Sequence, residues 1–142
     1  MPSWTTIYAA AFWPLLVGVC GAAIVRGDRA LGWTAIALLL TMIMGQLSLS
    51  VASYSDLEEG LAVSDVMLMI ALLALTIKWP RGWLMAMSAI QVLMVLGHVA
   101  RWSSGPTTRL TYAILTGSGA YLELALLAYA LLKQTGSPDR RV

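Results

Sequence analysis

Four polar residues interrupt long apolar stretches of the sequence, and their chemical types are those that move protons. Asp65, His98 and Glu123 supply two carboxyls and the only imidazole of the chain, and Gln91 supplies an amide. Ionisable groups inside apolar segments are costly, and where they occur they often form proton relays or ion pathways. Gln91 and His98 are seven residues apart, so a helix places them on one face, two turns apart.

On helices, other polar residues would lie on the same faces as these four. Ser88 extends the Gln91 face, and Thr76 shares a face with Asp65. Gln46 begins a polar side in an earlier apolar stretch. We predict that a helical bundle turns these faces inward and so contains a continuous row of polar groups, here called the polar seam. Its predicted members are Asp65, Gln91, His98, Glu123 and Gln46.

Two interpretations of the polar seam are open. In the first, the carboxyls and the imidazole carry protons or small cations. In the second, the polar groups only join helices by hydrogen bonds, within the chain or to another membrane protein, as Gln, Ser, Thr and His commonly do in membranes.

Small residues precede Glu123 by about one turn. Gly117, Ser118 and Gly119 would let another helix backbone approach closely, which predicts a packing face. The alternative at this place is a ligand or ion site at the Glu123 carboxyl.

Metal and haem chemistry are further alternatives. Thioethers are ligands for Cu(I), and methionine recurs in three Met-x-Met pairs, namely Met42 and Met44, Met67 and Met69, and Met85 and Met87. Residues two apart on a helix point in different directions, however, and methionine is an ordinary filler of apolar cores. His98 could hold a haem only with a methionine or with a second copy of the chain. We predict no metal and no cofactor.

Enzyme motifs are missing from the sequence. It has no nucleophile with a histidine and an acid at a recognisable spacing, no nucleotide-binding loop and no metalloprotease helix motif. Cys20 is the only cysteine, so an intrachain disulfide is excluded. We therefore predict no catalytic residue.

The composition explains what must position these groups. Of the 142 residues, 59% are hydrophobic and 11% are charged, against about 25% charged in an ordinary soluble domain. A soluble enzyme, a nucleic-acid binder and a disordered chain are poor fits, and the net charge of +2 is too small to indicate a polyanionic partner. The composition indicates an integral membrane protein whose first partner is the lipid bilayer.

Five stretches are long and apolar enough, or nearly so, to cross a bilayer as helices, which takes roughly 20 residues each. They cover residues 7–25, 32–53, 61–79, 83–100 and 110–133, separated by short connectors. We predict an all-α bundle of five transmembrane helices forming one domain over 1–133, followed by a polar cytoplasmic tail over 134–142.

Basic residues predict the orientation, because short cytoplasmic loops are enriched in Lys and Arg. With five alternating spans, one side of the membrane receives Arg26, Arg29, Lys78, Arg81, Lys133, Arg140 and Arg141. The other side receives Arg101, Arg109 and the acidic residues Asp56, Glu58 and Glu59. We therefore expect the N-terminus outside and the C-terminus in the cytoplasm.

The third and fourth apolar stretches resemble a pattern in uncharacterised small membrane proteins of alphaproteobacteria. The similarity is carried by Asp65, the Arg81-Gly82-Trp83 turn, Gln91 and His98. It implies that the two stretches form one helical hairpin to which these polar residues belong, in a bacterial inner membrane. It implies no activity.

From these observations we expect a non-enzymatic multi-span protein of the inner membrane. It would act as a homo-oligomer or as an accessory subunit of a membrane complex, with the polar seam at helix contacts. The competing hypothesis is a small proton or cation channel or transporter that uses Glu123, Gln91, His98 and Asp65.

Overall fold

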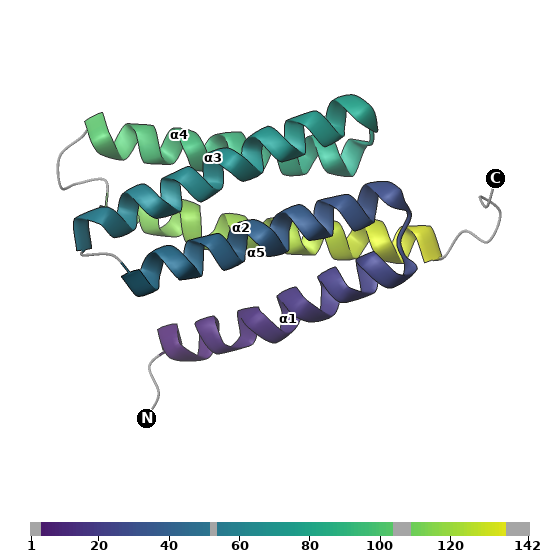
Figure 1. Cartoon of the computed structure of the whole chain (residues 1–142), viewed down its shortest axis with the longest axis horizontal. Coiled ribbons are helices and arrows are strands. Elements are labelled where there is room, and N and C mark those ends of the chain that lie inside the picture. Colours follow the sequence, from purple (N-terminus) through teal and green to yellow (C-terminus); the bar gives the residue numbers. More distant parts are fainter. Residues whose placement is uncertain (1–3, 52–53, 104–108, 136–142) are drawn as a thin grey trace.

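The structure is a computed structural model that describes the backbone over residues 4–51, 54–103 and 109–135, and side chains over 11–47, 60–100 and 118–134. Five long helices make up the described chain, and successive helices run in opposite directions (Figure 1). They are α1 (Trp4–Arg26), α2 (Arg29–Val51), α3 (Tyr54–Lys78), α4 (Gly82–Ser103) and α5 (Arg109–Thr135).

The two tight connections have clear local causes. Between α1 and α2, the Asp28 side chain accepts a hydrogen bond from the Leu31 backbone N–H at 3.0 Å and so caps the start of α2. A Cβ built on the preceding Gly27 would lie 2.8 Å from that of Leu31, so this turn needs glycine. Between α3 and α4, Pro80 follows the end of α3 because proline cannot continue the helix.

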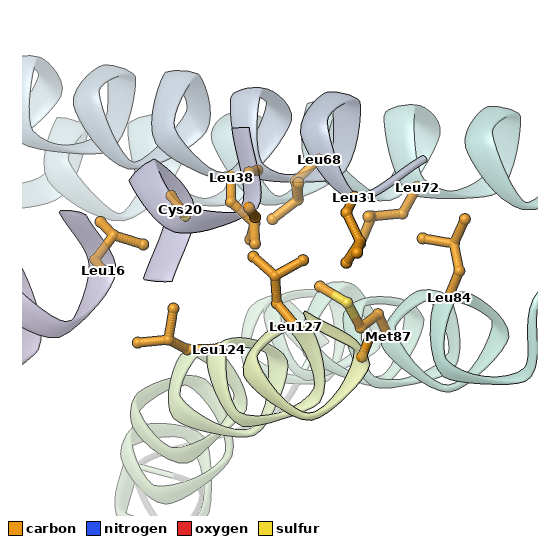
Figure 2. Packing of buried hydrophobic residues seen from close by; sticks show 13 residues of the cluster. Leu16, Cys20, Leu31, Leu38, Leu68, Leu72, Leu84, Met87, Leu124 and Leu127 are labelled. Carbon is orange, nitrogen blue, oxygen red and sulfur yellow. The ribbon is translucent and has the colours of Figure 1, made fainter. Parts of the chain in front are cut away.

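The helices form a closed ring in which each packs on its neighbours in sequence and α5 returns to α1. Helix α2 also contacts α5 across the ring. All five contribute to one apolar core, shown in Figure 2. Its large fully buried side chains include Leu16, Cys20, Leu31, Leu68, Leu72, Leu84, Met87 and Leu127.

The outer surface is apolar as well. Val25, Ile77 and Leu132 are each more than two thirds exposed. Three segments are long and apolar enough to cross a membrane, namely Arg29–Leu47, Gly60–Lys78 and Gly82–Ala100, and Ala11–Arg26 is a shorter apolar helix. A helical bundle with this surface belongs in a membrane, because exposed apolar area on this scale is unusual in a protein dissolved in water.

Basic side chains gather at one end of the bundle, here called the basic end. It holds the α1–α2 and α3–α4 connections and the last turn of α5 (Figure 1). Arg81 forms an ion pair with Asp28 across the two connections. The Asp28 backbone N–H donates to Oε1 of Gln134 in α5 at 3.2 Å. Exposed basic residues surround these contacts, namely Arg26, Arg29, Lys78 and Lys133.

The limits of all five helices differ from those of the predicted stretches, most of all at the start of α3 and also at the end of α5. Helix α3 begins at Tyr54, so the acidic segment expected to be a connector is helical. Acidic residues are favourable near a helix N-terminus, which the apolar pattern alone does not reveal. Helix α5 continues to Thr135, so it includes Gln134, which was assigned to the tail. Residues 136–142 lie outside the described chain.

Candidate functional site

The closest contact between predicted site residues joins α3 to α4. Nε2 of His98 lies 2.7 Å from Oδ2 of Asp65. His98 is buried, whereas the Asp65 side chain keeps 18% of its surface exposed. A carboxyl and an imidazole at this distance share one hydrogen bond, and a proton can reside on either group.

Gln91 joins the same pair from one side. Its Nε2 donates to the backbone carbonyl of Asp65 at 2.9 Å and to Oδ1 of the Asp65 side chain at 3.3 Å. Gln91 is fully buried, and its Oε1 has no hydrogen-bond partner among the described residues. The amide therefore satisfies its donor end and leaves its acceptor end open.

A second polar contact lies nearer the basic end. The hydroxyls of Thr76 in α3 and Ser88 in α4 are 2.8 Å apart, and Ser88 also bonds the Leu84 carbonyl at 3.0 Å. Since Ser88 donates to Leu84, Thr76 donates to Ser88. The α3–α4 contact thus carries hydrogen bonds at two levels, as the helical spacing predicts.

Glu123 faces the same interior from α5. Its side chain is completely buried, and in the described part of the chain neither carboxyl oxygen has a hydrogen-bond partner.

The contact of α4 with α5, together with helical spacing, puts Gln91 and Glu123 at the same level of the bundle. Gly119 is buried against the Met94 side chain, so these two residues define the register of the antiparallel pair. One turn toward the basic end, the facing positions are Gln91 and Glu123. One more turn brings Met87 and Leu127, which both belong to the core (Figure 2).

Both carboxyls lie far from either end of the bundle. At about 1.5 Å per residue, Glu123 is about 18 Å from the end of α5, and Asp65 is about 20 Å from the end of α3.

The remaining predicted residues lie elsewhere. Gln46 is exposed on α2 and does not join the polar seam. Ser118 is exposed, and Gly119 packs on Met94 as a small-residue packing face predicts. Gly117 lies in α5, where the structure describes only the backbone.

The methionine pairs are divided between the surface and the interior of the bundle. Met44, Met67 and Met85 are each about half exposed, whereas Met87 is fully buried. Among the residues with described side chains, no three His, Cys, Asp or Glu groups come together as a metal site. The structure thus combines a buried acid, Glu123, with the Asp65–His98 pair and the Gln91 amide. Carboxyl and imidazole groups can each bind and release a proton.

Two contacts were missed at the sequence level. Met94 fills the space beside Gly119, and no local pattern marks that pairing. Asp28 caps α2 and binds Arg81, and here a signal existed, because an Asp just before an apolar helix is a typical N-cap.

Comparisons of the chain with protein-family models, with curated proteins and with solved structures found no match.

Proposed function

We propose that this chain is an integral membrane protein that passes protons through its own helical bundle. The observation that carries the proposal is Glu123, a completely buried carboxyl in the middle of α5 with no partner for either oxygen in the described chain. Residues that only join helices satisfy each other's hydrogen bonds, and Glu123 does not do so.

The neighbouring groups support the same proposal. Asp65 and His98 share a hydrogen bond of 2.7 Å at the α3–α4 contact, and Asp65 keeps part of its surface exposed. An ionised carboxylate at the place of Glu123 would be costly without a partner, so the neutral acid is the resting form we expect. Release of its proton and uptake by the Asp65–His98 pair would be one step of transfer through the seam.

The membrane topology is part of the proposal. Each helix has between 22 and 27 residues, so at about 1.5 Å per residue each exceeds the roughly 30 Å of the hydrocarbon core. Five spans follow if α1 and α5 cross as well. The basic end would face the cytoplasm of a bacterial cell, with the N-terminus outside.

The alternative is a homo-oligomer or an accessory subunit of a larger membrane complex. The observation that favours it is that the Thr76–Ser88 and Gln91–Asp65 bonds join α3 to α4 within the chain, as structural hydrogen bonds do. Because the seam is interior, a partner would have to bind the apolar outer surface instead.

Reconstitution into vesicles tests the proposal. Purified protein is incorporated with a pH-sensitive dye inside, and proton flux is driven by a potassium diffusion potential. We expect flux with the native chain, flux at the level of empty vesicles with Glu123→Gln, and native flux with Gln46→Met. The last variant is the matched control, because it removes an exposed polar side chain of α2.

Two outcomes would overturn the proposal, namely no flux with the native protein or full flux with Glu123→Gln. In either case, the particle size after extraction with native lipids, together with the proteins that co-purify, would test the assembly alternative directly.

A further inference from the structure

The hydrogen bond from Gln91 to Asp65 fixes which end of the Gln91 amide faces Asp65. Its partner at 2.9 Å is the backbone carbonyl of Asp65, which can only accept a hydrogen bond, so the NH2 end of the amide must face Asp65. The oxygen end therefore points away from Asp65, where it is buried without a partner among the described residues.

Glu123 is the group placed to supply a hydrogen-bond donor for that oxygen. The Met94–Gly119 contact sets the register in which Gln91 and Glu123 face each other, and Glu123 also lacks a partner in the described chain. A neutral carboxyl has one O–H to donate, and one water molecule between the two groups would carry that hydrogen bond to the amide oxygen.

Few other ionisable groups enter the core around this pair. Helix α3 contributes Asp65, α4 contributes His98, and α1 contributes the buried thiol of Cys20. Helix α2 has no ionisable side chain between Ala30 and Leu47. The chemical environment of Gln91 and Glu123 is therefore dominated by Asp65 and His98.

We infer that Gln91 is a positioning residue that couples the protonation of Glu123 to the Asp65–His98 pair, an inference that rests on the proposed proton transfer. With Glu123 neutral, hydrogen bonds run from its O–H through one water molecule to Gln91 Oε1, from Gln91 Nε2 to Asp65, and between Asp65 and His98. These contacts connect α5, α4 and α3 by one continuous series of hydrogen bonds.

When Glu123 loses its proton, it changes from a hydrogen-bond donor into an acceptor. The proton leaves Glu123 for a water molecule, and the carboxylate then faces the amide oxygen, an acceptor that repels it. This repulsion shifts the Gln91 side chain and weakens the longer hydrogen bond from its Nε2 to Oδ1 of Asp65, whereas the bond to the Asp65 backbone carbonyl stays. The amide itself neither gains nor loses a proton. Asp65 is then freer to accept a proton than before.

Two spectroscopic signals test the coupling in protein reconstituted in lipid discs. The first is the infrared carbonyl stretch of the protonated Glu123, assigned by its loss in Glu123→Gln. The second is the imidazole nitrogen resonance of His98. As the pH is raised, we expect both signals to change together in the native chain.

In Gln91→Met, which keeps the length of the side chain but has no amide, we expect the Glu123 band to shift to higher frequency and the two signals to change independently. The matched control is Thr76→Val, which removes a separate α3–α4 side-chain hydrogen bond and should leave the coupled change intact. Gln91→Asn provides a second variant, because its shorter amide can hold only one of the two partners.

Coupled signals in both Gln91 variants would overturn the inference, as would a Glu123 band that does not respond to Gln91→Met. Vesicle flux is measured separately. Coupled signals without flux would reject the proposed function and leave the coupling standing, whereas flux without coupling would reject the role of Gln91 alone.

Discussion

At the scale of single residues, Glu123 is the most costly side chain in the described bundle. A buried polar atom without a partner costs about 1–3 kcal/mol, and Glu123 has two such oxygens. The neighbouring Asp65–His98 pair has its hydrogen bond satisfied. A side chain that lowers stability in the centre of a fold is a common sign of function, because activity and stability often conflict.

Replacing Glu123 by methionine is expected to stabilise the protein by about 1–3 kcal/mol while abolishing proton flux, because the new side chain fills the same space without unpaired oxygens. The measurement is the midpoint of unfolding in mixed detergent micelles. Gln46→Met is the control and should change stability little, since Gln46 is exposed. A less stable Glu123→Met variant would show that the contact of the neutral carboxyl with Gln91 outweighs the cost of burying the carboxyl.

Asp65 and His98 are expected to stabilise each other. A double-mutant cycle with Asp65→Ala and His98→Ala should give a coupling free energy of about 1–2 kcal/mol, the upper part of the range for hydrogen bonds between membrane helices. The same cycle between Asp65 and Ser88, which do not bond each other, serves as the reference. Equal coupling in both cycles would contradict a specific Asp65–His98 bond.

Most of the site was predictable from residue types and spacing. Polar residues deep in apolar stretches turn toward protein, and this rule placed Asp65, Gln91 and His98 together. It failed for Gln46, which is exposed near the end of α2, where a long polar side chain can reach the lipid headgroups. The bond from Gln91 to a backbone carbonyl could not be predicted, because it depends on how closely α3 and α4 approach.

At the scale of helices, the contact of Gly119 with Met94 sets the position of α5 along α4. A Cβ built on Gly119 would overlap the Met94 side chain, with its Cγ 2.9 Å away. The register that this contact defines brings Glu123 opposite Gln91, so a single glycine positions the candidate site.

Gly119→Ala is expected to destabilise the protein by about 1–3 kcal/mol, the usual cost of overpacking. Met94→Ala in the same chain should recover part of that loss by making room. Gly21→Ala is the control, because a Cβ there meets nothing within 4 Å. If Gly119→Ala proves as harmless as Gly21→Ala under the same unfolding assay, the register argument fails.

The five helices were predictable because uninterrupted apolar runs in a membrane leave the backbone little choice but helix. The residues at which the helices begin and end were less predictable. Helix α3 extends back to Tyr54 through an acidic segment that hydropathy assigns to a connector. Which helices are neighbours in the ring, including the return of α5 to α1, depends on side-chain fit and not on any local pattern.

At the scale of the whole molecule, Asp28 ties several helices together at the basic end. It caps α2, forms an ion pair with Arg81 beside α4, and through its backbone binds Gln134 of α5. We expect Asp28→Ala to cost about 1 kcal/mol through loss of the cap.

Asp28→Asn keeps a capping oxygen and should cost less, as should Arg81→Gln, since partly exposed ion pairs contribute about 0–1 kcal/mol. Thermal unfolding in lipid discs gives the order of the three variants. An Arg81→Gln loss larger than that of Asp28→Ala would reverse this ranking and assign the main role to the ion pair.

The orientation of the chain can be tested by labelling. In a Cys20→Ala background, single cysteines replace Arg29 at the basic end or Ser104 between α4 and α5. A membrane-impermeant maleimide added to intact cells is expected to label the Ser104→Cys variant and to reach the Arg29→Cys variant only after the membrane is broken. The opposite pattern would invert the proposed topology.

The contacts of Asp28 have a mechanical consequence. Through these contacts Asp28 restrains how α1 and α2, α4 and α5 can move relative to one another at the basic end. His98 lies in the half of α4 that points away from the basic end. Hydration from that side would reach the imidazole before it reaches the acid on α5, so charge would enter and leave against unequal barriers.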